Sequence, residues 1–250
     1  MKTLIFSDVH EQVDLLDQLL TAVPHDRAIG HGDFFDDYCT SPAKVQRTAE
    51  WIRSHLNDFD SVLGNHDVPY FYGATTGHYN CPGYSRERGT LVRTILGPEH
   101  WQKFTLHAWV DGWLVAHAGV HPYLFRAAGI KLDPEGMKEV IDYACSDALR
   151  ALRLGQRHFM VGWGSDRGGD DQVVGGINWL DWNSLQAIPG LNQLVGHTYD
   201  PDKIRSKVTP ESQNFCLDTG FHHFAIIEDG RLEIYKTEDF IGKWRRRKAR

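Results

Sequence analysis

The chain has 250 residues, of which 41% are hydrophobic and 12% aromatic, and this length and composition are enough to bury a substantial core. The formal charge of −6 argues against a general polyanion binder, so contact with nucleic acid is not expected, although fourteen histidines leave the charge sensitive to pH and metal. We therefore expect a single α/β domain in which any basic site is local.

Two sequence features bear on the compartment. The four cysteines are widely scattered and form no C-x-x-C pair, which favours buried or free thiols over a disulfide framework. The apolar run at residues 4–6 is too short for a signal-peptide core, and no run is long enough to span a bilayer. These features predict a cytoplasmic protein without membrane association.

The first predicted strand, residues 3–7, opens directly onto Asp8 and His10. Residues two apart on an extended chain face the same way, so this carboxylate and imidazole could hold one metal ion from one side. The mixture of ligands suits manganese, iron or zinc. The alternative is a helix-capping aspartate beside a solvent-exposed histidine.

A predicted helix over residues 12–22 returns the chain to a second strand at residues 27–29, which completes a β-α-β unit. This strand leads to Asp33, and ligand sites in open α/β sheets lie at the carboxyl ends of strands. A carboxylate can bridge two cations about 3.5–4 Å apart, an arrangement that clamps a phosphoryl group. We expect Asp33 to act as this bridge, Asp36 to position it and Asp37 to lie in a solvated turn.

A second predicted helix, residues 42–57, leads to a third strand at residues 61–63, which is followed closely by Asn65, His66 and Asp67. An asparagine oxygen can ligate a metal, and a histidine beside it can exchange a proton with the substrate. A neighbouring carboxylate can fix the tautomer of that histidine. The three residues are therefore predicted to serve as ligand, proton donor and orienting group.

Residues 68–103 fit no simple period and are rich in Tyr, Phe, Gly and Pro, which predicts an ordered insertion near the site. A packed structural loop and a substrate-contacting lid are equally good interpretations. His78, Arg86 and Arg88 could face a polar ligand or only water. We expect the insertion to belong to one domain that spans residues 1–242.

A predicted hairpin, with strands at 108–110 and 113–115 around an Asp-Gly turn, delivers His117, and a strand at 193–195 delivers His197. Four further strands are expected to complete a second sheet. They are predicted at residues 204–208, 214–217, 223–227 and 232–235. Residues 243–250 form a basic tail that could touch nucleic acid, but a frayed, solvated terminus is the simpler interpretation.

The candidate ligands and their neighbours form five short motifs: Asp8-x-His10, Gly32-Asp33-x-x-Asp36, Gly64-Asn65-His66-Asp67, His117 and Gly196-His197. In this order they resemble the motif series of the calcineurin-like metallophosphoesterases, and the resemblance covers positions 3 to 198. It implies a four-layer α/β/β/α sandwich with metals at the strand ends. It also implies a two-metal phosphoester hydrolase in which a metal-held hydroxide attacks phosphorus.

The resemblance assigns a role to each motif residue. The implied ligands of the first metal are Asp8, His10 and Asp33. Those of the second metal are Asp33, Asn65, His117 and His197. His66 would protonate the leaving oxygen or stabilise the transition state. The implied cofactors are two divalent ions, taken here as manganese, with iron or zinc as alternatives.

Two further segments resemble the branch that holds the Ser/Thr protein phosphatases and the bacterial diadenosine tetraphosphate hydrolases, rather than the nuclease branch. One is the His-Ala-Gly sequence at 117–119 with a following proline, and the other is Arg-Gly-Gly at 167–169. In that branch such an arginine meets the substrate phosphate, so Arg167 is the candidate phosphate clamp. The alternative is an ion pair with one of its acidic neighbours, which are Asp166, Asp170 and Asp171.

Two departures from family patterns bear on the substrate. Tyr199 stands where nuclease and cyclic-nucleotide members carry a second histidine, and Asp37 stands where eukaryotic-type Ser/Thr phosphatases carry an arginine. We therefore predict a phosphatase that acts on phosphomonoesters or on nucleotide or dinucleoside polyphosphates. The alternatives are a Ser/Thr phosphoprotein phosphatase, a phosphodiesterase or nuclease, and a non-catalytic phosphate-binding scaffold.

Overall fold

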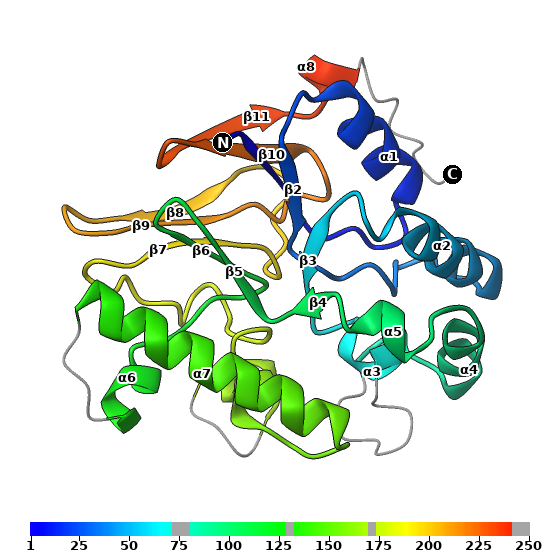
Figure 1. The fold of residues 1–250 in the computed structure, drawn as a ribbon, viewed down its shortest axis with the longest axis horizontal. Helices are drawn as coiled ribbons and strands as arrows, with labels where there is room; N and C mark the ends of the chain where they lie inside the picture. Colours follow the sequence, from blue (N-terminus) through cyan, green and yellow to red (C-terminus); the bar gives the residue numbers. More distant parts are fainter. Residues whose placement is uncertain (72–80, 129–132, 170–173, 242–250) are drawn as a thin grey trace.

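Two β-sheets pack against each other between helices in the computed structural model, which describes residues 1–71, 81–128, 133–169 and 174–241 (Figure 1). The predicted α/β class and four-layer sandwich are confirmed. None of the helices in these ranges is long and apolar enough to cross a membrane.

The first sheet has six strands in the order β11-β10-β1-β2-β3-β4. Their bounds are β1 Thr3–Phe6, β2 Arg27–Gly30, β3 Asp60–Val62, β4 Phe104–Thr105, β10 His223–Glu228 and β11 Arg231–Lys236. Strands β1 to β4 are parallel neighbours, whereas β10 pairs antiparallel with both β1 and β11. The expectation that the last two strands complete the second sheet is therefore wrong, because β10 forms its ladder with the first strand of the chain.

The second sheet has five strands in the order β5-β6-β7-β9-β8. Their bounds are β5 His107–Val110, β6 Trp113–Ala116, β7 Asn192–Val195, β8 Arg205–Val208 and β9 Gln213–Cys216. The predicted hairpin is β5–β6, and β6, β7 and β9 run parallel. Both sheets thus contain a parallel set, and these sets carry the candidate ligands.

Side chains alternate between the two faces of each strand and so pack in different hydrophobic clusters. Leu4 and Phe6 pack in the cluster that contains the helix residues, whereas Ile5 between them packs in the cluster that contains residues of both sheets. In the same way, Leu114 packs in the cluster with the helix residues, whereas Val115 packs in the cluster with residues of both sheets. This period of two is expected of strands buried on both faces.

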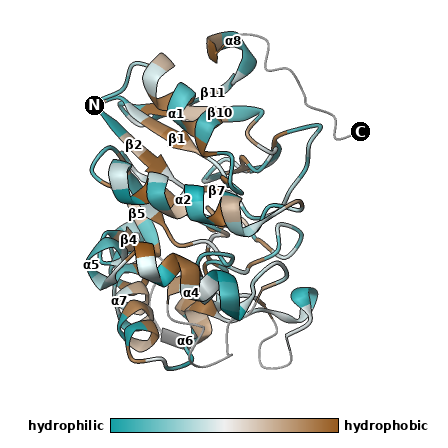
Figure 2. Ribbon diagram, turned by 90° about the vertical axis from the view of Figure 1, so that its right-hand side faces the viewer, coloured by the Kyte–Doolittle hydropathy of each residue, from teal (hydrophilic) through white to brown (hydrophobic). Residues whose placement is uncertain are grey.

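Helices cover the outer face of each sheet (Figure 1). Those beside the first sheet are α1 Val13–Ala22, α2 Pro42–His55, α3 Val68–Phe71, α4 Arg86–Ile95, α5 Pro98–Trp101 and α8 Glu238–Ile241. Those beside the second are α6 Tyr123–Ala128 and α7 Pro134–Arg153. Figure 2 shows hydrophobic and hydrophilic residues alternating along α1 and α2, as expected of helices with one face on a core.

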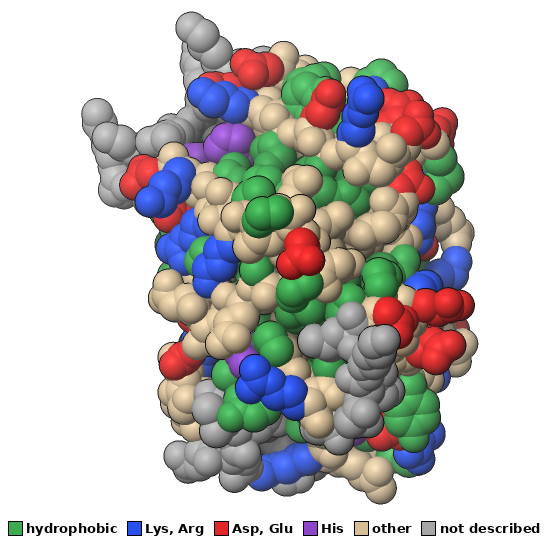
Figure 3. All heavy atoms as spheres, turned by 90° about the vertical axis from the view of Figure 1, so that its left-hand side faces the viewer, with side chains coloured by type: hydrophobic (Ala, Val, Ile, Leu, Met, Phe, Trp, Pro, Cys, Tyr) green, Lys and Arg blue, Asp and Glu red, His purple; other side chains and the backbone are tan. Residues whose placement is uncertain are grey.

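The insertion contains regular structure that its composition did not predict. Helices α3, α4 and α5 lie within residues 68–103, and Ser85 caps α4 by accepting a hydrogen bond from the backbone of Arg88. His78 lies outside the described residues, as does the tail at 243–250. On the face drawn in Figure 3, Lys and Arg side chains are interspersed with Asp and Glu, so this face presents no large patch of one sign.

Candidate metal centre and cleft

The candidate ligands follow strands whose carboxyl ends meet. Asp8 comes after β1, Asp33 after β2 and Asn65 after β3 in the first sheet, and His117 and His197 follow β6 and β7 in the second. The two sheets join at this point, because the backbone N–H of His197 donates to Asp8 Oδ1 at 2.9 Å. The strand ends therefore bring together residues that are far apart in sequence.

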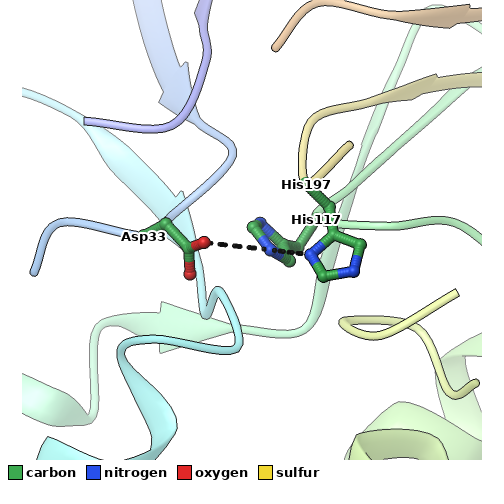
Figure 4. A group of neighbouring side chains, drawn as sticks. All are labelled: Asp33, His117 and His197. Carbon is green, nitrogen blue, oxygen red and sulfur yellow. Dashed lines mark hydrogen bonds and ion pairs between the residues drawn. The ribbon is translucent and has the colours of Figure 1, made fainter. Parts of the chain in front are cut away.

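Five of these side chains form two groups that share Asp33. One group is Asp8, His10 and Asp33, the other is Asp33, His117 and His197, and the candidate ligand atoms of each group lie within 4.8 Å of one another. Asp33 Oδ2 lies 3.8 Å from His10 Nε2 and 3.4 Å from His117 Nε2. Figure 4 shows the Asp33 carboxylate directed at the two imidazoles of the second group.

Asn65 contributes an oxygen to the second group. Its Oδ1 atom lies 2.8 Å from His117 Nε2 and 2.8 Å from His197 Nδ1. Its Nδ2 faces the thiol of Cys81 at 3.5 Å, and that thiol donates to the Asn65 carbonyl at 3.0 Å. Cys81, which belongs to the insertion, thus helps to orient the amide so that its oxygen faces the histidines.

Backbone carbonyls fix the imidazoles in ligand-ready tautomers. His10 Nδ1 lies 3.0 Å from the carbonyl of Phe35, and His117 Nδ1 lies 2.7 Å from the carbonyl of His31. A backbone carbonyl can only accept a proton from Nδ1, so each contact favours the tautomer in which Nε2 has a lone pair for a metal.

The buried carboxylates of the cluster favour a bound cation. Burial raises the pKa of Asp33 well above its usual value, and the Asp8 carboxylate raises it further. Burial also lowers the pKa of His117 to about 4 and that of His197 well below its usual value, so both rings are neutral. Within the described residues, no Lys or Arg is ion-paired to Asp8 or Asp33. Buried carboxylates beside neutral imidazoles are a donor set that a divalent metal ion fits.

The backbone around the cluster is tightly constrained. A Cβ atom on Gly64 would lie 2.0 Å from Asp33 Oδ1, and one on Gly196 would lie 2.1 Å from Asp8 Oδ2. Only glycine allows the strand ends to approach the carboxylates this closely. Asp33 and His197 adopt the left-handed region, with φ of 50° and 69°.

His66 is oriented by Asp36 rather than by Asp67. Its Nδ1 lies 3.1 Å from Asp36 Oδ2, while Asp36 Oδ1 accepts a hydrogen bond from the Tyr70 hydroxyl at 2.5 Å. Asp36 was expected to position Asp33, but the residue that its carboxylate contacts is His66. Because Nδ1 of His66 faces a carboxylate, Nε2 is the nitrogen left for the substrate.

The carboxylate of Asp67 contacts backbone amides rather than His66. Its carboxylate accepts backbone N–H groups of Asp33 at 2.7 Å, Phe34 at 2.8 Å and Gly64 at 2.9 Å. Adjacency in sequence suggested that it orients His66, but the turn after β3 directs its carboxylate to these amides instead. Asp67 thereby ties the loop after β2 to the loop after β3.

Arg167 lies in the same cleft as His66 and His197. Its Nη2 is ion-paired with Asp181 Oδ2 at 2.8 Å and donates to Thr198 Oγ1 at 3.4 Å. Asp166, one of the alternative partners considered from the sequence, instead accepts a hydrogen bond from the Ser184 hydroxyl. The other two, Asp170 and Asp171, lie outside the described residues.

Comparison with known proteins identifies the architecture. The sequence model of the calcineurin-like phosphoesterase family matches residues 1–201. The chain belongs to this family. It is accordingly a metal-dependent phosphoesterase, a hydrolase, and the predicted superfamily is confirmed. A comparison with curated protein sequences gives no significant match.

Solved structures share the fold of this phosphoesterase. A point mutant of a cold-active protein tyrosine phosphatase superposes with a TM-score of 0.59 and 15% identity, over 95% of this chain and 78% of that one. The cold-active protein-tyrosine phosphatase of a psychrophilic Shewanella species gives 0.57 and 14%, with the same coverage of 95% and 78%.

The cleft of this phosphoesterase contains residues that were not predicted. Its volume is about 1010 Å³, and Asp218 and Trp163 line it together with the candidate catalytic residues. Asp218 follows β9 closely, so the signal that found the other strand-end residues could have found it. Asp181, the ion-pair partner of Arg167, lies in a connecting segment and does not follow a strand, so no such signal marked it. Arg88 of the insertion also lines the cleft, and its Nη1 donates to the carbonyl of Gly83.

Proposed function

We propose that this phosphoesterase binds two divalent metal ions, with manganese as the proposed metal and iron or zinc as alternatives. The proposed ligands are Asp8, His10, Asp33, Asn65, His117 and His197. The observation that supports this most strongly is that Asp33 belongs to both ligand groups. One carboxylate can hold two cations about 3.5–4 Å apart, and a pair at this spacing suits phosphoryl transfer.

Three side chains of the protein would act on the substrate directly or through a neighbour. The bound ions would supply Lewis-acid chemistry and neutralise phosphate charge. His66 would donate a proton from Nε2 to the leaving oxygen, while Asp36 holds Nδ1 and stabilises the cationic ring. Arg167, which lines the same cleft, would bind the non-bridging oxygens of the phosphate in the substrate and in the transition state.

The proposed substrates are phosphomonoesters, or nucleotide and dinucleoside polyphosphates. Tyr199 rather than a further histidine lines the cleft two residues after His197, which argues against a diesterase. Asp37 is ion-paired with Lys44 at 2.6 Å, which argues against the arginine-dependent recognition of Ser/Thr phosphatases. All four cysteines are free, which supports a reducing, cytoplasmic location.

The test combines metal counting with a choice of substrate. Protein loaded with manganese is analysed for bound metal and assayed on p-nitrophenyl phosphate and on bis-p-nitrophenyl phosphate. We expect two ions per chain and faster hydrolysis of the monoester. One ion per chain would contradict the two-metal proposal, and a preference for the diester would contradict the substrate class.

A further inference from the structure

We propose that Asp181 is a positioning residue that holds the Arg167 guanidinium in place for the substrate phosphate. This inference rests on the phosphate-binding role proposed for Arg167. Asp181 lies outside the ligand motifs. Its ion pair with Arg167 joins two segments that both follow α7.

Arg167 lacks support from regular structure. It is the last residue of a 3₁₀ turn, η3 (Ser165–Arg167), and the following Gly168 is in the left-handed region with φ of 80°. Its side chain is 31% exposed. A free arginine side chain carries about 2 kcal/mol of rotamer entropy, so an unrestrained Arg167 would sample many directions. A contact that selects one direction therefore has a large effect on phosphate binding.

Asp181 is well placed to select that direction, because its own carboxylate is held. Its Oδ1 accepts the backbone N–H of Asn183 at 2.8 Å, which leaves Oδ2 to contact Arg167. The side chain of Asp181 is only 14% exposed, so solvent screens this pair less than it would a surface pair.

The turn that carries Asp181 is anchored from the second sheet. Lys207 Nζ, on β8, donates to the carbonyls of Trp182 and Leu185, each at 2.6 Å. The backbone N–H of Trp182 donates to Thr198 Oγ1 at 3.2 Å, and the same oxygen accepts from Arg167. Thr198 directly follows the candidate ligand His197. The arginine, its aspartate and the metal cluster are thus fixed relative to one another.

The anchoring leaves donors available to a ligand. Both printed contacts of the guanidinium use Nη2, so within the described part of the chain Nη1 and Nε have no hydrogen-bond or ion-pair partner. Arg167 lines the cleft. Loss of Asp181 would keep the charge in the cleft but release its direction, so phosphate affinity would fall more than metal binding or the chemical step.

The experiment compares Asp181→Asn with Asp166→Asn, a matched change in the neighbouring loop, each also made on an Arg167→Ala background. KM and kcat on p-nitrophenyl phosphate, inhibition by inorganic phosphate, metal content and thermal unfolding are measured. We expect Asp181→Asn to raise KM and the phosphate inhibition constant by about 5- to 20-fold, the usual effect of losing one oriented charged hydrogen bond, with little change in kcat. On the Arg167→Ala background the same change should have no further effect, and Asp166→Asn should behave as wild type.

Three results would overturn the inference in distinguishable ways. If Asp181→Asn has equal effects with and without Arg167, or leaves the phosphate inhibition constant unchanged, the positioning role of Asp181 is contradicted but the role of Arg167 is not. A wild-type rate for Arg167→Ala would contradict the proposed role of the arginine itself. If Asp181→Asn does not fold, Asp181→Glu keeps the charge but moves it by one methylene, and the same shift in phosphate inhibition is expected.

Discussion

The two sides of the cleft are built in different ways. The metal side uses strand ends, and four of its six proposed ligands are almost fully buried, with Asp8 at 1% and His117 at 0% exposure. The substrate side uses connecting segments, and Arg167 and Arg88 reach the cleft from a 3₁₀ turn and from the first turn of α4. The difference teaches that sheet register brings the ligands of the metal side together, whereas residues on connecting segments depend on a side-chain partner for their direction.

Asp33→Asn should have the largest effect, because it removes the charge shared by both ligand groups. We expect loss of both ions and a fall in kcat/KM of more than roughly 10³-fold, since bridging charge stabilises the metal pair. His10→Ala is the matched change on the same side, and it should retain more metal because His10 belongs to one group only. Metal analysis and steady-state kinetics check this. Wild-type turnover by Asp33→Asn would refute the shared role.

His66→Gln tests a residue that lies at the metal cluster without being a proposed ligand. Metal content should remain near that of the wild type, and kcat should fall by about 10²- to 10⁴-fold, the range for a positioned acid-base group. The measurement is single-turnover hydrolysis together with metal analysis. Loss of metal in this variant would instead identify His66 as a ligand.

Arg167→Ala tests the substrate side. Both ions should remain bound, and kcat/KM should fall by on the order of 10²- to 10³-fold, because the phosphate loses this contact in the bound substrate as well as in the transition state. Arg167→Lys should recover little, because an ammonium is a point charge rather than a planar fork. Kinetics on a small aryl phosphate distinguish these outcomes. A near-wild-type rate for the alanine variant would move the search for a phosphate-binding group to Arg88.

Asp142→Ala gives the smallest effect, because Asp142 lies outside the cleft, on α7. It accepts hydrogen bonds from Trp109 at 2.8 Å and Lys138 at 2.6 Å. We expect the free energy of unfolding to fall by about 1 kcal/mol, as for a partly exposed polar contact, with kcat/KM unchanged. Denaturant unfolding and kinetics check this. A loss of activity here would show that the two sides of the cleft are not the whole functional unit.

The sequence was most informative where chemistry follows a strand. Asp33, His117 and His197 were found because apolar runs end in ligand-type residues, and the structure brings all three together. Pairing between distant strands could not be predicted from local patterns. One neighbour of β1 in the sheet is β10, which lies more than two hundred residues later. The second sheet was therefore assigned two strands that belong to the first.

Side-chain partners from separate loops were also beyond sequence reasoning. Asp67 is next to His66 in the chain, but Asp36 reaches the imidazole because its backbone turns through a left-handed φ of 64°. Likewise, among the described residues the ion-pair partner of Arg167 is Asp181 rather than the adjacent Asp166. Local spacing predicts which residues reach an edge of a sheet, but it does not predict how loops fold back over that edge.

The left-handed backbone of the site has a consequence for evolution and engineering. Of eight non-glycine residues with positive φ in the described ranges, five lie at or beside the site, and they are His10, Glu11, Asp33, Asp36 and His197. Each such conformation costs on the order of 1–3 kcal/mol, so a selection for heat tolerance alone would favour glycine at these positions. Glu11 is the one such residue outside the proposed machinery, and Glu11→Gly is where stability could rise without loss of a ligand. At the other four, selection for stability and selection for chemistry oppose each other.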